Sequence, residues 1–211
     1  MRVGPASGTE LTPRSPALSP QGGEGDNALM PIVWTEDPEA NRLLETDPLA
    51  LLIGLVLDQQ VKMEKAFSGP YVLKQRLGHL DARKIAAMDP DKLVAVFRER
   101  PALHRFPGSM AQRVQALCQS VVKDYGGDAA AVWTGARDGD DLAVRIKKLP
   151  GFGDMKVKIL VAVLAKKFGV KPAGWEKHAA NWHTVADVDS EESMAEARVV
   201  KREMKLKAKK T

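Results

Sequence analysis

One stretch decides the fold: Arg145-Ile146-Lys147-Lys148-Leu149-Pro150-Gly151-Phe152-Gly153-Asp154-Met155-Lys156-Val157-Lys158-Ile159. It predicts a helix, a tight turn over Leu149–Gly153 and a second helix. Two glycines in the turn allow unusual backbone angles and a close approach to the backbone. The first amides of the second helix then point outward and, with the helix dipole, form an anion site beside Lys156 and Lys158. The alternative is a glycine-containing turn between two core helices.

Helical periodicity continues on both sides of this hairpin. Residues 49–57 are apolar nearly all round, which predicts a helix buried on most faces, and Asp47-Pro48 precedes it as a cap. Other helices are predicted over about 37–44, 63–78, 81–88, 89–97, 107–125, 140–148, 156–168 and 190–207. Because no useful stretch alternates apolar and polar residues, the predicted fold class is all-α.

Composition excludes several classes of protein. The 211 residues suffice for one domain or two small helical lobes, and 44% hydrophobic residues allow a core. The net charge of +5 is compatible with an anionic partner such as nucleic acid. The single cysteine, Cys118, excludes an internal disulfide, a cysteine zinc site and an iron–sulfur cluster. No histidines and carboxylates have metal-ligand spacing, so no metal site is predicted beyond an alkali cation at the hairpin carbonyls.

Three segments are predicted along the chain. Residues 1–29 are rich in Gly, Pro, Ser and Thr, and we expect them to be a disordered N-terminal extension, with Met30 as a plausible true start. Residues 30–189 form the main domain, and residues 190–211 form an amphipathic helix with a basic tail. No apolar stretch has the length of a membrane span and no signal-peptide core is present, so we expect a cytoplasmic protein.

The order and spacing of these motifs resemble the endonuclease III-like helix-hairpin-helix DNA glycosylases over residues 47–178. The resemblance rests on Leu57-Asp58-Gln59-Gln60 after the buried helix, on Gly126-Gly127 after a later helix, and on the hairpin. The chain is also similar to a small bacterial branch that lacks the family's four-cysteine cluster, so no cofactor is expected. The resemblance implies a two-lobed helical fold with a central cleft. It also implies a monomer that binds duplex DNA through phosphates and flips a base out of it.

The resemblance also assigns the DNA contacts. The glutamine turn of such enzymes fills the space left by the flipped base, which points to Gln60, with Gln59 second. The alternative is a glutamine at a helix end that satisfies loop backbone. The remaining predicted DNA contacts belong to the hairpin and the start of its second helix: Leu149, Gly151, Phe152, Gly153, Lys156 and Lys158.

The chemistry implied by the resemblance is hydrolysis without a lyase step. Where several relatives carry a lysine nucleophile, this chain has Met155, whose thioether cannot form a Schiff base. Lys156 is rotated by about 100° along the helix and is expected to point elsewhere. The family's catalytic aspartate corresponds by position to Glu176, with Asp187 and Asp189 as further candidates. The alternative for Glu176 is a solvated side chain.

Four further side chains are candidates for a base pocket, or else for core packing: His104, Phe106, Trp175 and Trp182. Two functions remain open at this point. One is a monofunctional DNA glycosylase, favoured by the glutamine turn and the hairpin. The other is a DNA-binding protein without catalysis, favoured by Met155, by Glu176 and by Asp154, which places negative charge at the anion site. A helical protein–protein scaffold is a third.

Overall fold

The computed structural model describes residues 30–208, so the prediction that residues 1–29 are disordered lies outside the described part, as do the last three residues. The described chain forms α1 (Pro38–Thr46), α2 (Pro48–Leu57), α3 (Met63–Leu77), α4 (Ala82–Ala87), α5 (Pro90–Arg98), α6 (Pro107–Tyr125), α7 (Ala131–Thr134), α8 (Gly139–Lys148), α9 (Asp154–Lys167) and α10 (Glu191–Ala208), with the 3-10 turns η1 (Trp175–His178) and η2 (Val185–Asp187). Residues 30–208 contain no strand, which confirms the all-α fold class.

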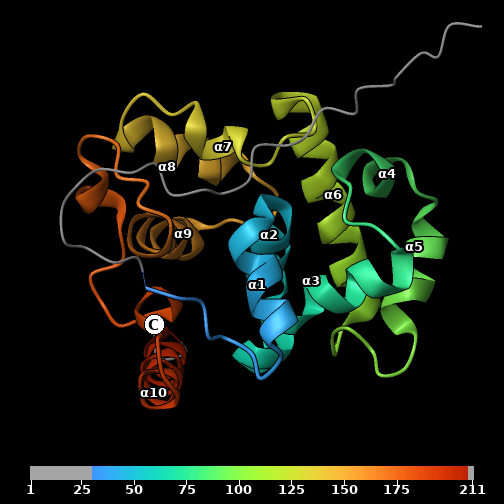
Figure 1. Cartoon of the computed structure of the whole chain (residues 1–211), viewed down its shortest axis with the longest axis horizontal. Helices are drawn as coiled ribbons and strands as arrows, with labels where there is room; N and C mark the ends of the chain where they lie inside the picture. Colours follow the sequence, from blue (N-terminus) through green and yellow to red (C-terminus); the bar gives the residue numbers. More distant parts are fainter. Residues whose placement is uncertain (1–29, 209–211) are drawn as a thin grey trace, which may run out of the picture.

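Helix α2 forms the centre of the molecule and lies between two groups of helices (Figure 1). Asp47 caps its start, and its carboxylate accepts hydrogen bonds from the amides of Leu49 at 2.9 Å and Ala50 at 3.2 Å. Every residue after Pro48 is buried, as the uniformly apolar sequence predicts. Helix α3 packs so closely that a Cβ on Gly54 would lie 2.8 Å from the ring of Phe67.

The first lobe holds α3, α4, α5 and α6 (Figure 1, green). Helix α6 packs against both α4 and α5, and its apolar face is buried. Gln115, on the same helix, donates a hydrogen bond to the Met88 carbonyl at 2.6 Å and so satisfies the end of α4. A glycine in the left-handed conformation, Gly126, ends α6 as the sequence predicts.

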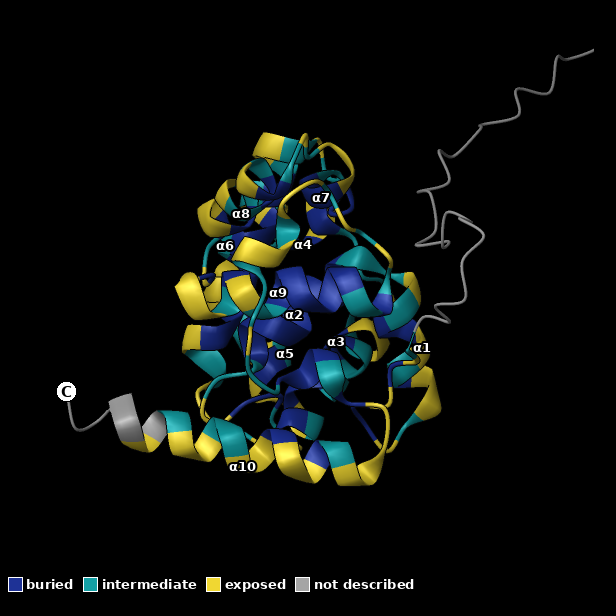
Figure 2. Ribbon diagram, turned by 90° about the vertical axis from the view of Figure 1, so that its left-hand side faces the viewer, coloured by how far each residue is buried: buried dark blue, intermediate teal, exposed yellow. Residues whose placement is uncertain are grey.

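The second lobe contains the helix pair α8 and α9, the two 3-10 turns and α10. Helix α10 lies along the edge of the molecule and presents an exposed outer face (Figure 2), while Met194 and Ala197 are buried beneath it. The two lobes on either side of α2 agree with the predicted two-lobed fold. None of the helices among residues 30–208 is long and apolar enough to cross a membrane.

Candidate nucleic-acid interface

The hairpin between α8 and α9 is anchored in the core by its two large side chains. Leu149 and Phe152 are 2% and 4% exposed, and the Phe152 amide donates to the Leu149 carbonyl at 3.1 Å. Gly151 has φ +89°, a conformation that favours glycine, and a Cβ there would lie 3.5 Å from Val56. The turn is therefore packed against the C-terminal end of α2, and its contribution to an interface comes from backbone and not from these side chains.

The start of α9, where the sequence predicts an anion site, carries one carboxylate, and a lysine pairs with it. Asp154 forms an ion pair with Lys147, and this hydrogen bond lowers the pKa of the aspartate. Asp154 makes no side-chain capping bond to α9. The first amides of a helix have no acceptor within it, so they remain suited to a phosphate oxygen. Lys158 is exposed nearby, with its amine 5.8 Å from the ring centre of Trp182.

The glutamine turn after α2 separates its two glutamines into different roles. The side-chain amide of Gln59 is held at both ends: its Nε2 donates to the Val56 carbonyl at 2.6 Å, and its Oε1 accepts from Arg113 at 2.7 Å. Gln60 is exposed and has φ +55°. Gln59 thus satisfies the end of its own helix, while the side chain of Gln60 is presented to the outside.

His104 is buried next to the glutamine turn and forms a hydrogen bond with its backbone. It is 1% exposed, and its Nε2 lies 2.8 Å from the Gln59 carbonyl, while its Nδ1 accepts from the Phe106 amide at 3.1 Å. Because Nδ1 accepts, the proton of the neutral ring is on Nε2, which donates to the Gln59 carbonyl. Burial lowers the pKa of His104 and so favours the neutral ring. His104 is a support of the glutamine turn, and Phe106 is partly exposed beneath the Arg105 guanidinium.

Lys156 connects the hairpin helix to the glutamine turn. Its Nζ lies 3.2 Å from the Val56 carbonyl, the same acceptor that Gln59 uses. Burial lowers the pKa of Lys156 to about 8, although the nearby Asp58 acts in the opposite direction. Met155 is 47% exposed beside it, and both side chains line one pocket. The sequence predicts that Lys156 points away from the position of Met155. The two side chains nevertheless line the same pocket, while the Lys156 amine is directed at α2.

This pocket, which we call the hairpin pocket, has a volume of about 290 Å³. It lies between the start of α9, the glutamine turn, residues 182–185 and α10, and its walls are mostly apolar. Asp58 is the one carboxylate among its lining residues; its side chain is 13% exposed and pairs with Lys201 of α10. Asp58 is not among the carboxylates predicted from the sequence, because the resemblance places the catalytic carboxylate after α9.

The structure does not bring the carboxylates predicted from the sequence into the hairpin pocket. Glu176 is exposed in η1, which lies at the start of α8, because the Gly139 amide donates to the Ala173 carbonyl at 2.8 Å. The hairpin is at the other end of α8, about 15 Å away for a helix of this length. Asp187 pairs with Lys166 and caps η2, and Asp189 accepts from Ser193.

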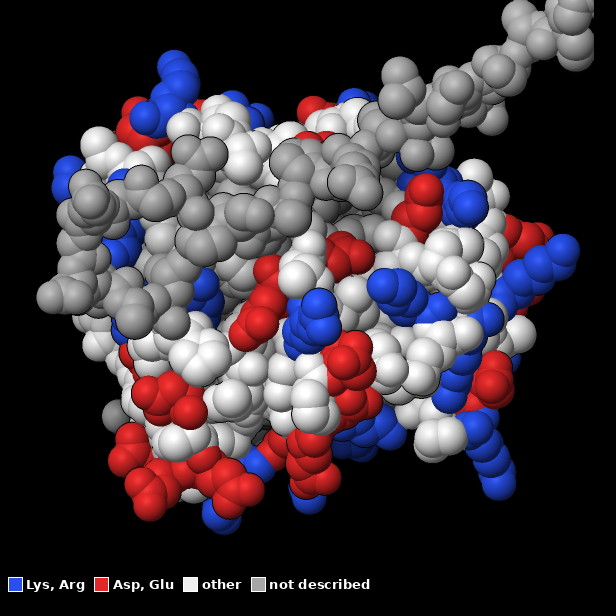
Figure 3. Space-filling view, viewed as in Figure 1, with Lys and Arg blue, Asp and Glu red and all other residues white. Residues whose placement is uncertain are grey.

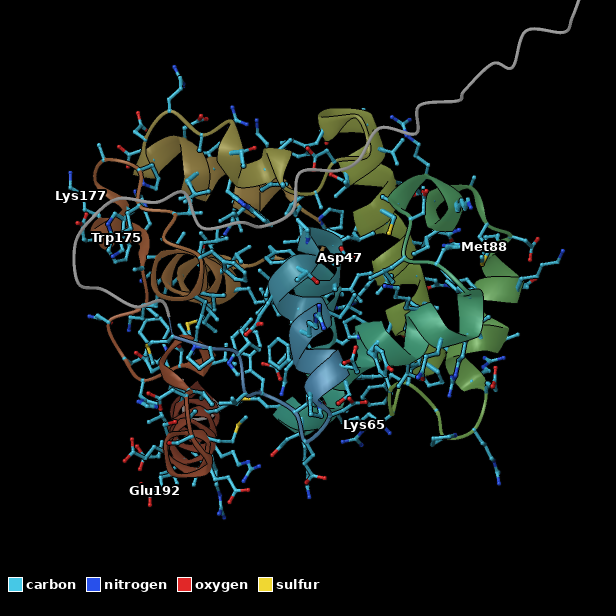
Figure 4. The ribbon with its side chains drawn as sticks, in the orientation of Figure 1. Asp47, Lys65, Met88, Trp175, Lys177 and Glu192 are labelled. Atoms are coloured by element: carbon cyan, nitrogen blue, oxygen red, sulfur yellow. The ribbon has the colours of Figure 1, made fainter. Side chains whose placement is uncertain are left out.

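Of the four predicted pocket aromatics, Trp182 alone lines the hairpin pocket. Trp175 packs on the start of α8, where a Cβ on Gly139 would lie 2.6 Å from the Trp175 backbone nitrogen. Figure 4 labels Trp175 and Lys177 at the outer edge of this lobe. The catalytic and pocket roles given to these residues remain predictions, and the geometry favours Trp182 among them.

A glycine-containing hairpin between two helices of an all-α domain defines the helix-hairpin-helix class of proteins. The family model described as HhH-GPD superfamily base excision DNA repair protein matches residues 53–210, and the chain belongs to this superfamily. The match covers the second half of α2, the glutamine turn, the hairpin and α10, and DNA is therefore the partner of this chain. No match was found among curated proteins or among solved structures.

Proposed function

We propose that this protein is a monofunctional DNA glycosylase that hydrolyses the N-glycosidic bond of a damaged or mispaired base flipped out of duplex DNA. The observation that carries the proposal is the hairpin pocket itself, about 290 Å³ in volume and lined by both the hairpin helix and the glutamine turn. Its volume is at the lower end of ligand pockets, which suits a single base. We expect the protein to act as a monomer in the cytoplasm.

Each part of the interface has a task in this proposal. The amides at the start of α9 hold a phosphate, and the exposed Gln60 enters the stack where the base has left. An uncharged amide is suited to this position because it can donate to and accept from an orphaned base. Trp182 and Met155, both lining the hairpin pocket, supply surfaces against which the flipped base packs.

Asp58 is the carboxylate that we assign to the chemistry. A carboxylate beside the sugar stabilises the positive charge that develops as the glycosidic bond breaks, and it orients the attacking water. Asp58 lines the hairpin pocket, whereas Glu176, Asp187 and Asp189 do not. These three stay second candidates, to be tested beside it.

The reaction proposed here has no lyase step. Met155 holds the position of the amine nucleophile, and the Lys156 amine is engaged by the Val56 carbonyl at 3.2 Å. An imine between enzyme and sugar is therefore not expected, and borohydride should trap no covalent adduct. A trapped adduct that disappears in a Lys156→Met variant would overturn the monofunctional assignment.

The function is tested by incubating the protein with duplexes that each carry one modified or mispaired base, followed by alkali to cleave abasic sites. Cleavage of at least one duplex, dependent on alkali, is the expected result. The second candidate is a DNA-binding protein without catalysis, which Met155 and the exposed Glu176 favour. Binding of every duplex at low salt with excision of none would support that candidate instead.

A further inference from the structure

A second hollow adjoins the hairpin pocket; its walls are also mostly apolar, but most of its charged lining residues are cations. It has a volume of about 910 Å³ and lies between the glutamine turn, the loop before α6 and the C-terminal half of α10. Its charged lining residues are five cations and one carboxylate: Lys62, Arg105, Arg198, Lys201, Arg202 and Glu64. We call this hollow the basic groove. No motif in the sequence marks it, because its cations come from three separated segments.

We propose that the basic groove binds the sugar–phosphate backbone of one DNA strand, as a second anchoring site beside the hairpin. The proposal rests on the proposed function only in that both require duplex DNA. It assigns α10 a direct part in binding.

Two of the cations are already used to hold α10 in place. Lys201 pairs with Asp58 of the glutamine turn, and Arg198 pairs with Glu64 of α3. Both links join α10 to the segment that follows α2. They hold the two sides of the groove together.

The other three cations are available to a ligand. Lys62, Arg105 and Arg202 are exposed, and within residues 30–208 no carboxylate lies at ion-pair distance from any of them. Their like charges repel across the groove until an anion occupies it. The groove also contains apolar surface from Val61, Met63 and Leu206. Cations with apolar surface between them match a strand of phosphates and sugars better than a single small anion.

Helix α10 is polarised along its length. Three of its four glutamates, Glu191, Glu192 and Glu196, lie in its first half. The second half contains Glu203 and four of the five lysines and arginines of the helix. Acidic side chains gather at the lower left of Figure 3, in the corner where Figure 4 labels Glu192. From there α10 runs along the edge of the molecule to its basic end (Figure 2). The acidic end, which would repel DNA, is thus kept away from the groove.

The basic groove and the hairpin pocket share a boundary. Met63 and Lys201 line both of them, and Ala197, Val200 and Met204 of the same helix form part of the pocket wall. One face of α10 therefore closes the base pocket while the adjacent face carries the cations. A strand lying in the groove would lead directly to the pocket that receives its flipped base.

The test compares two triple variants with the same change in net charge. The groove variant is Lys62→Ala, Arg105→Ala and Arg202→Ala. The control variant removes three exposed lysines elsewhere, Lys123→Ala, Lys171→Ala and Lys177→Ala. Binding of an undamaged duplex is measured as a function of salt, and thermal melting verifies that both variants fold.

Each phosphate contact contributes about 0.9 to the slope of log affinity against log salt. The groove variant should therefore lose about 2 to 3 from the slope, and the control variant less than 1. A single Arg202→Ala variant should lose about 1. Equal slopes in the groove and control variants would overturn the proposal.

The outcome is separable from that of the proposed function. If the protein excises a base from none of the duplexes, but the salt dependence of binding is weaker in the groove variant than in the control, the groove proposal is supported and the catalytic proposal fails. If wild-type protein excises a base but the groove variant binds like the control, only the groove fails. Absence of any salt-dependent binding by the wild-type protein would overturn both.

Discussion

Helix α9 has a lysine near each end that donates to backbone carbonyls: Lys156 is partly buried and Lys167 is buried. Near the hairpin, Lys156 donates to the Val56 carbonyl at 3.2 Å. At the opposite end, Lys167 donates to the carbonyls of Pro31 at 2.8 Å and Val188 at 2.6 Å. Burial lowers the pKa of each to about 8. Among residues 30–208 no carboxylate lies at ion-pair distance from either amine, and both donate to backbone oxygens.

The two lysines differ in whether a ligand could reach the amine. Lys167 is 5% exposed and joins three segments of backbone, while Lys156 lines the hairpin pocket beside Asp58. A lowered lysine pKa is often taken as a sign of a catalytic amine. Here it reports burial at both ends of one helix, and only the position of the pocket distinguishes them. The comparison shows that the position of the pocket, and not the lowered lysine pKa, distinguishes the end of α9 for which a function is proposed.

The largest effect should be the loss of excision activity when Asp58, at the hairpin-pocket end of α9, is replaced. Asp58→Asn keeps the size of the side chain and removes its charge, so the single-turnover excision rate should fall by roughly a hundredfold, the scale of a lost charge-stabilising group. Lys167→Met, at the other end of α9, should leave the rate per folded molecule unchanged. Full activity of Asp58→Asn together with loss of activity in Glu176→Gln would return the catalytic role to Glu176.

A smaller effect should appear in the pH dependence of stability. Below about pH 8 Lys167 is protonated in both the folded and the unfolded chain, so its burial cost is fully present. Between about pH 8 and 10.5 the folded state releases the proton first, and the unfolded state binds more protons. The free energy of unfolding should therefore rise with pH across this window, by about 1–3 kcal/mol at about 1.4 kcal/mol per pKa unit.

Denaturant unfolding of the wild-type protein and of Lys167→Met at pH 7.5 and pH 10 measures this contribution. Groups that titrate in both proteins, such as Tyr125, cancel in the difference between them. Relative to the variant, the wild-type protein should gain stability at the higher pH. A difference that does not change with pH would show that Lys167 is not buried in its charged form.

The helices of this fold could be predicted from local signals. Proline next to a capping aspartate marks the starts of α1, α2 and α5, and the observed limits of α6, Pro107–Tyr125, are those expected from its apolar spacing. The sequence does not reveal α7, η1 and η2, because three or four residues are too few to show a period. Helix α9 also begins earlier than predicted, at Asp154.

The candidate site could be predicted only in part, because it combines local and distant elements. The hairpin and the glutamine turn are continuous in sequence and were recognised there. Asp58 was interpreted only as the polar end of α2, since its partner Lys201 lies 143 residues away. Its position directly before Gln59-Gln60 was the available signal. Glu176 was counted along the chain, and the turn after Gly169 carries it to the wrong end of α8 for contact with the hairpin.

The smallest effect should come from removing residues 1–29, which precede the segment that Lys167 holds. The sequence predicts that residues 1–29 contribute nothing to the core, so a protein that starts at Met30 should keep its melting temperature within about 1–2 °C.

Deleting five further residues should lower the melting temperature. Removing residues 30–34 as well takes away the Pro31 carbonyl that Lys167 uses, and Trp34, which is fully buried. Loss of a buried tryptophan alone costs about 3–5 kcal/mol. At roughly 2–4 °C per kcal/mol for a chain of this size, this second deletion should lower the melting temperature by about 6–20 °C. Thermal melting of the two shortened proteins beside the full chain separates the cases. If the first deletion alone destabilised the protein as much as the second, the packing around Lys167 would have to extend into residues 1–29.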